Sequence, residues 1–224
     1  MPIDYTLVRS KKRKRSFSLK ITSDGALQVN VPYKTKLADI ESFIAEKHQW
    51  IVAKQKQNQR LVPPEYTYQS GEKHYYRGRT LPLHLIVCHF SSVRFTQDSI
   101  AIFHRKNSSI KNILVKAYKQ EALQYLTQRT HELAQAFSLT TLKQVKVRQM
   151  KARWGSCSHD GIITYNSHLI KAADDLIDYV IIHELCHLVH HNHGRGFYRL
   201  QSALNPRWKT QKQSLHEQGY RLIY

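Results

Sequence analysis

Residues 176–193 read LIDYVIIHELCHLVHHNH and carry the pattern from which the rest of the 224-residue chain can be interpreted. Within them, His183, Glu184 and His187 form the H-E-x-x-H pattern of zinc hydrolases. On a helix the two histidines share one face and lie about 6 Å apart along the axis, so both imidazoles can reach one ion. Glu184 then lies beside that ion, where it can accept a proton from a polarised water. The apolar run before His183 predicts a buried helix, although two hydrogen-bonded histidines would also explain the pattern without a metal.

The motif leaves the third metal ligand open, because a catalytic zinc site needs three protein ligands and one open position. The candidates are His190, His191 and His193. His190 continues the row of His183 and His187 along a straight helix. Such a row is about 10 Å long, so the three imidazoles would not converge easily on one ion.

A ligand that follows the end of the helix can fold back over the site, and this favours His193. Asn192 and Gly194 flank it, and both residue types tolerate the left-handed conformation that commonly ends helices. The spacing from His187 to His193 is also that of the pattern H-E-x-x-H-x-x-G-x-x-H, with His190 in place of the turn glycine. We therefore expect the chain to reverse after His190. The predicted site consists of Glu184 as catalytic base and of His183, His187 and His193 as ligands of Zn²⁺.

Several segments around the motif together resemble one known family. They are Lys151–Cys157 (KARWGSC), Asn166, Ile177–Val180, His183–Leu188, Asn192–His193 and Phe197. This combination resembles the YgjP-like metallopeptidase family, a zincin-type group that is distantly similar to the SprT and WLM proteases. The resemblance extends from about Arg13 to Gly219 and implies a hydrolase in which water, activated by zinc and Glu184, attacks a peptide carbonyl.

In zincins an edge strand beside the metal holds the peptide substrate by strand addition. By position, either residues 162–166 or the Arg153–Trp154 segment can supply this edge, and ordinary core and turn structure explains them equally well. We predict substrate-binding roles for Arg153, Trp154 and Asn166.

A second hypothesis keeps the metal site and changes the substrate to a nucleoside triphosphate. The resemblance allows it, since YgjP-like proteins have been assigned UTP pyrophosphatase activity, and the many basic residues suit a triphosphate. Residues 71–80 superficially resemble a phosphate loop. They fail as one, because six residues rather than four separate the glycines and Arg79 replaces the lysine. A third hypothesis is a nucleic-acid-associated module whose zinc is structural and is closed by His190 or His191.

The formal net charge of +19, from 35 Lys and Arg against 16 Asp and Glu, implies attraction to polyanions. Lys11–Arg15 is an uninterrupted basic run, but no zinc-finger, RNP or basic-zipper pattern accompanies it. We therefore expect at most nonspecific nucleic-acid contact, and a solvated basic surface explains the charge equally well.

The remaining composition favours a cytoplasmic protein without a membrane partner. No apolar run approaches the 18 or so residues that span a bilayer, and Met1–Asp4 does not resemble the start of a signal peptide. The three cysteines are too few for a disulfide framework, and Cys186 within the apolar run is predicted to be a packed small residue. The oligomeric state is left open.

The element pattern predicts an α+β fold with two lobes. Residues 1–105 form a β-rich lobe with a hairpin around Asp24-Gly25, one helix over 36–57 and short strands over 66–103. Residues 106–224 form a zincin-like lobe on which the first lobe packs. Its predicted elements are a long helix from Ser108 or Ser109 to Phe137, strands 145–149 and 162–166, the metal helix 174–191 and two shorter helices. In the long helix, the predicted inward residues are Ile110, Ile113, Ala117, Tyr125 and Leu133.

Overall fold

The structure is a computed structural model that describes residues 4–22, 26–59 and 65–223. The chain divides into two compact units, Met1–Pro64 and Glu65–Tyr224. Helices and small sheets occur in both units, so the predicted α+β class is confirmed. The packing of one lobe on the other stays a prediction.

The first unit contains a three-stranded sheet in the order β1-β3-β2. Strand β1 (Tyr5–Ser10) is parallel to β3 (Leu27–Pro32), and β3 pairs antiparallel with β2 (Ser18–Ile21). The predicted hairpin is therefore confirmed in its strands, while its turn at Asp24-Gly25 lies outside the described residues.

Two helices, α1 (Leu37–Glu46) and α2 (His48–Gln59), replace the single helix predicted over 36–57. The backbone leaves the helical range at Lys47, where ψ is 9°, although its N–H still bonds to the Phe43 carbonyl. The predicted apolar stripe therefore runs over two helices. The core of this unit consists of Leu27, Val29, Val31, Ile40, Ile44 and Ile51.

The second unit begins with a four-stranded sheet in the order β4-β5-β7-β6. Its strands are β4 (Lys73–Tyr76), β5 (Arg79–Val87), β6 (Ser92–Phe95) and β7 (Ile100–His104). The hairpin predicted around residues 75–80 is confirmed, with Arg77 and Gly78 at positive φ in the turn. The unit boundary lies at 64/65 rather than at the predicted 105/106, because the apolar residues of this sheet share one core with the helix that follows.

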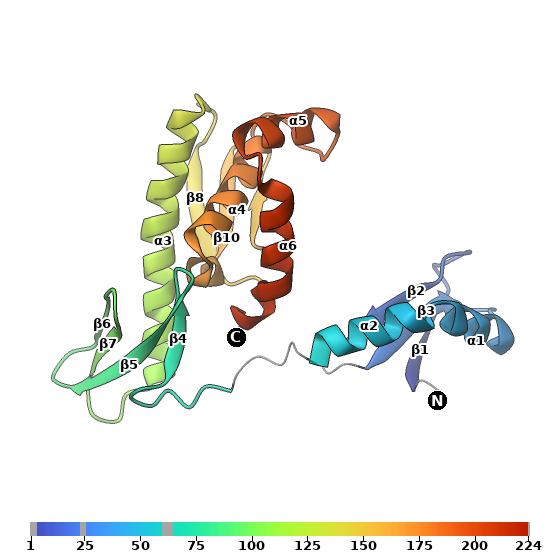
Figure 1. Cartoon of the computed structure of the whole chain (residues 1–224), viewed down its shortest axis with the longest axis horizontal. Coiled ribbons are helices and arrows are strands. Elements are labelled where there is room, and N and C mark those ends of the chain that lie inside the picture. The colour runs from blue at the N-terminus through green and yellow to red at the C-terminus, as the bar shows by residue number, and fades with distance from the viewer. Residues whose placement is uncertain (1–3, 23–25, 60–64, 224) are drawn as a thin grey trace. The chain divides into compact units, whose positions relative to one another are not determined.

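Helix α3 (Ile110–Ala136) is the long helix of the second unit (Figure 1). The Ser109 hydroxyl accepts from the Asn112 N–H at 3.3 Å, so the predicted N-cap is confirmed. Of the predicted inward residues, Ile110, Ile113, Tyr125 and Leu133 are partly buried and pack against the core. The fully buried stripe lies beside them, one residue further along the helix. It consists of Leu114, Tyr118, Ala122, Leu126, Thr130 and Ala134.

The sheet next to the motif helix has the order β8-β10-β9. Strand β10 (Ile162–Asn166) is parallel to β8 (Gln144–Arg148) and antiparallel to β9 (Gly155–Cys157). Residues 162–166 thus form the central strand, with both edges paired, and cannot be the predicted substrate-binding edge. The two edge strands are β8 and β9, and β9, which follows Arg153–Trp154, is the one that contacts the motif helix.

The chain ends in short helices that surround the motif. They are η1 (Ser167–Lys171), α4 (Asp174–Cys186), α5 (Arg195–Leu204), α6 (Trp208–Gln218) and η2 (Gly219–Arg221). Helix α4 carries the motif, and it packs against α3, α5 and α6 (Figure 1) and also against β9. The two shorter helices predicted after the motif are thereby confirmed as α5 and α6.

The cysteines Cys88, Cys157 and Cys186 are free thiols. Cys186 is fully buried beside Phe197, as predicted for a packed small residue. Among the residues that the structure describes, no helix combines the length and the apolar character needed to cross a bilayer.

Candidate metal centre

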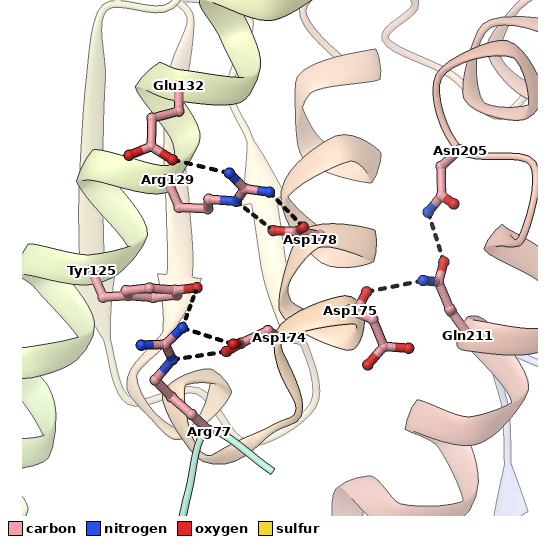
Figure 2. A network of polar contacts seen from close by, with 9 residues as sticks. All are labelled: Arg77, Tyr125, Arg129, Glu132, Asp174, Asp175, Asp178, Asn205 and Gln211. Atoms are coloured by element: carbon pink, nitrogen blue, oxygen red, sulfur yellow. Dashed lines mark hydrogen bonds and ion pairs between the residues drawn. The ribbon is translucent and has the colours of Figure 1, made fainter. Parts of the chain in front are cut away.

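Two bidentate ion pairs fix the first half of the motif helix α4 (Figure 2). Arg77 in the β4–β5 turn donates to both carboxylate oxygens of Asp174 at 2.8 and 2.7 Å. Arg129 of α3 donates to both oxygens of Asp178 at 2.8 Å. Arg77 also lies 4.3 Å from the Tyr125 ring. Because each guanidinium makes two parallel bonds, these contacts fix the orientation of α4 as well as its position.

Helix α4 ends earlier than predicted, at Cys186 with His187 as its C-cap, rather than at residue 191. The N–H groups of Val189 and His190 both bond to the Cys186 carbonyl, at 3.2 and 2.9 Å, which tightens the last turn. The reversal that was expected after His190 therefore begins before it. The His190 ring lies close to Gly196, where an added Cβ would be 2.9 Å from it.

This reversal brings three imidazoles together. The ligand atoms of His183, His187 and His193 all lie within 4.8 Å of one another. The Nε2 atoms of His183 and His193 are 3.1 Å apart. Phe197 of α5, which is fully buried, packs against all three rings with centroid distances of 4.6 to 5.0 Å. The structure thus groups the three residues that the sequence predicted, and α5 supplies the surface behind them.

Acceptors on the far side of two rings determine which nitrogen points into the cluster. The His183 Nδ1 lies 3.2 Å from the Gln201 Oε1, and the His187 Nδ1 lies 3.0 Å from the His190 carbonyl oxygen. An acceptor at Nδ1 requires the proton there, so the Nε2 lone pair is left for a metal. Burial, followed by the neighbouring histidines, lowers the pKa of His183 to about 4, and burial lowers the pKa of His187. Both imidazoles are therefore neutral at pH 7, as metal ligation requires.

Glu184 lies against the β9 backbone, and its side chain is buried. A Cβ built on Gly155 would lie 2.5 Å from the Glu184 Oε1, so only glycine allows this approach. Burial raises the pKa of Glu184 to about 8, and the Arg153 guanidinium opposes the rise. A carboxyl group with a pKa near neutrality is suited to exchange protons during a reaction.

An open cleft of about 400 Å³ lies beside Glu184. Its lining comes from the segment before and within β9, from α4 and from α6, and includes Trp154, Tyr179, His183, Glu184, Lys212 and His216. Trp154, for which a substrate contact was predicted, thus lines this cleft. Arg153 is exposed, and its charge acts on Glu184.

The structure contradicts the predicted substrate contact of Asn166. This residue is fully buried, and its amide group donates to the Met150 and Arg153 carbonyls at 2.8 and 3.0 Å. Its Oδ1 accepts from the His168 N–H at 3.2 Å. Asn166 therefore holds the loop that carries Arg153 and Trp154, and it offers no atom to a ligand.

Several residues of the site were not predicted. Tyr179 could have been found from the sequence, because it lies one turn before His183 on the same helix face. In the structure, burial raises the pKa of Tyr179 to about 12. Gln201 lies one turn after Phe197 in the same way. Lys212 and His216 had no sequence signal, since only the packing of α6 brings them to the cleft.

Three convergent imidazoles next to a buried carboxyl group fit a metal-dependent hydrolase, and His183 and Glu184 of this group line the open cleft. The family model described as YgjP-like, metallopeptidase domain, matches residues 15–218. The chain therefore belongs to the YgjP-like family and is a hydrolase of metallopeptidase type, which confirms the resemblance inferred from the sequence. No curated protein matches the chain.

Two solved structures are distantly similar to part of the chain. The metallopeptidase zymogen abylysin of Pyrococcus abyssi is 20% identical with a TM-score of 0.38, and the match covers 41% of this chain and 93% of abylysin. The metallopeptidase zymogen jannalysin of Methanocaldococcus jannaschii is 17% identical with a TM-score of 0.38, and the match covers 41% of this chain and 94% of jannalysin.

Proposed function

We propose that the protein is a zinc-dependent peptidase in which His183, His187 and His193 hold the ion and Glu184 is the general base. The observation that carries the proposal is the convergence of three imidazoles, whose ligand atoms lie within 4.8 Å of one another, next to a buried carboxyl group. The residues come from α4 and from the loop before α5, so the arrangement exists only in the folded chain.

The donor set fits zinc. Two nitrogens bound to one zinc ion at about 2.1 Å lie on the order of 3.4 Å apart, close to the 3.1 Å between the Nε2 atoms of His183 and His193. Imidazole nitrogen suits zinc, whereas magnesium and calcium prefer oxygen ligands. The acceptors at Nδ1 of His183 and His187 are the outer contacts that orient histidine ligands in metal sites.

The chain's own groups would perform the proton transfers and hold the substrate. Bound zinc would supply a Lewis acid that polarises the scissile carbonyl and acidifies water. Glu184 would accept a proton from water and return it to the leaving amine. Strand β9 is an edge strand that pairs only with β10 among the described strands, and Gly155 within it touches Glu184. An extended peptide added to this edge would thus lie beside the base.

Neither alternative has comparable support. A triphosphate with magnesium requires an oxygen-rich site, and the only metal-type cluster among the described residues is the histidine triad. A closed structural zinc site would need a fourth ligand. The two candidates for that ligand have other neighbours. The ring centroid of His191 lies 4.0 Å from that of His159, and the ring of His190 lies close to Gly196.

The test compares Glu184→Gln with the control Glu41→Gln, an exposed residue of α1. Zinc content and cleavage of an unfolded protein substrate are measured for both. We expect Glu184→Gln to retain about one zinc ion per chain and to lose roughly 10²- to 10⁴-fold in turnover, the usual contribution of acid–base catalysis. Turnover within about tenfold of the parent would exclude Glu184 as the base. Release of pyrophosphate from UTP without peptide cleavage would favour the second hypothesis.

A further inference from the structure

The cleft beside Glu184 has two chemically different sides. Val180 and Leu215, both buried, contribute apolar lining, and the Trp154 ring adds to it. The α6 side presents two basic side chains, Lys212 and His216, one helical turn apart. Both are exposed, so a ligand entering the cleft meets them directly.

Helix α6 holds these basic side chains in a fixed position. Gln211, directly before Lys212, is buried; its amide donates to the Asp175 carbonyl of α4 at 3.1 Å and its Oε1 accepts from Asn205 at 2.7 Å (Figure 2). Leu215, directly before His216, is also buried. The α6 face that carries Lys212 and His216 is therefore anchored to the helix that carries the metal ligands.

The α6 side of the cleft is positively charged, because Lys212 is the lining side chain with a fixed positive charge. The Lys212 ammonium is close enough to His183 to contribute to the lowered pKa of that ring. The only acidic residue in the lining is Glu184, which is buried and offset by Arg153. An anionic group with a short apolar stem would contact both sides of the cleft, and lysine is a donor that recognises such a group as a point charge.

We propose that Lys212 and His216 form a carboxylate-binding subsite, so that the preferred substrate is a peptide with a carboxylate next to the scissile bond. The carboxylate belongs either to an Asp or Glu side chain or to the C-terminus of the peptide. This inference rests on the proposed peptidase function, because it assigns specificity to the same cleft.

Binding to the zinc-loaded full chain with Glu184→Gln tests the subsite without turnover. Three fluorescent peptides carry an amidated C-terminus and differ only in one central residue, which is Glu, Gln or Lys. A fourth carries Gln and a free C-terminal carboxylate. We expect the Glu peptide or the free-carboxylate peptide to bind about tenfold more tightly than the amidated Gln peptide, the gain typical of a charge-assisted hydrogen bond. The peptide that gains affinity shows whether the subsite binds a side-chain carboxylate or the C-terminal carboxylate.

Adding Lys212→Met should remove this difference, and Lys212→Glu should turn the preference towards the Lys peptide. The matched control is Lys209→Met, because Lys209 is an exposed lysine of the same helix that lies over the Trp208 ring and outside the cleft. Equal affinity for all four peptides, or an equal loss with Lys209→Met, would overturn the subsite.

Cleavage of the same peptides by the zinc-loaded parent separates the two proposals. Cleavage without a carboxylate preference would overturn the subsite and leave the peptidase proposal intact. Absence of cleavage, together with the expected binding pattern, would overturn the peptidase proposal and support the carboxylate subsite.

Discussion

The cores of the two units differ in the side chains that they bury. In the first unit, all buried side chains among the described residues are apolar, namely Leu27, Val29, Val31, Ile40, Ile44 and Ile51. The second unit buries a larger apolar core together with polar and charged groups. These are His74, Thr130, Asn166, Ser167, His168, Lys171, Glu184, Gln201, Asn205 and Gln211.

Burial of a polar group costs free energy unless hydrogen bonds compensate, so its location is informative. Several of the buried polar groups serve the site directly. Asn166 holds the loop before β9, Gln201 orients His183, and Gln211 ties α6 to α4. In the second unit, several of the buried polar groups therefore lie at the candidate metal centre and its cleft, where their hydrogen bonds position the residues of the site. Among the residues whose burial is described, the charged side chains of the first unit are exposed, apart from the half-buried Arg13 in the run Lys11–Arg15.

The largest expected effect concerns the metal ligands of the second unit. His193→Ala should lower zinc affinity by more than about 100-fold. Loss of a residue that only hydrogen-bonds to a metal ligand costs up to about 100-fold, and loss of a ligand itself should cost more. His190→Ala should leave the affinity nearly unchanged, because the contact of this residue to His187 comes from its backbone carbonyl. Competition with a fluorescent zinc chelator measures both. The reverse ranking would make His190 the ligand.

Gly155→Ala should separate metal binding from catalysis. The new Cβ would displace the Glu184 carboxylate, and displacement of a catalytic group by about 1 Å can cost roughly 100-fold in rate. Zinc content should not change, since no metal ligand is touched. Ser156→Ala, one residue further along β9, is the control. Activity within about twofold of the parent would show that Glu184 tolerates the shift.

Lys171 should make the stability of the second unit depend on pH. Burial lowers its pKa from 10.5 to about 7, although it donates to the Leu222 carbonyl and lies over the Tyr118 ring. Between these two pKa values the unfolded chain binds a proton that the folded chain does not. The free energy of unfolding therefore gains from this group as pH rises above 7, by at most about 1.4 kcal/mol per pH unit.

Urea unfolding of the parent and of Lys171→Met at pH 7 and pH 9 measures this contribution. The parent should gain more stability over this interval than the variant, because the variant has no ammonium to deprotonate. Equal gains would show that Lys171 stays charged in the fold.

The smallest expected effect on the site concerns the first unit. Neutralising Lys11–Arg15 with glutamine should leave peptide cleavage within about twofold and should weaken nonspecific DNA binding. The salt dependence of that binding should also become shallower, because fewer phosphates are neutralised. Fluorescence anisotropy at several salt concentrations measures this. Unchanged DNA binding would mean that the basic run is a solvated surface without a role in DNA binding. Loss of peptide cleavage would mean that the first unit contributes to the peptidase activity.

Local pattern alone determined the parts of the protein that depend on neighbours in sequence. The H-E-x-x-H spacing predicted α4 and two of the clustered histidines, because residues four apart share a helix face in any helix. The N-cap at Ser109 and the strands of both hairpins were likewise predicted from residues that are neighbours in the sequence. The choice of His193 over His190 followed from the length of a straight helix, and the structure groups His193 with the other two.

Tertiary packing decided what periodicity cannot express. Helix α4 ends at Cys186 because the chain must turn for His193 to reach the cluster beside Phe197. Strand β10 became central and Asn166 buried because β8 and β9 pair on either side of it. Lys212 and His216 reach the cleft only because α6 packs on α4. Each of these outcomes depends on contacts between segments distant in sequence, and the free energy of such contacts overrides local preference.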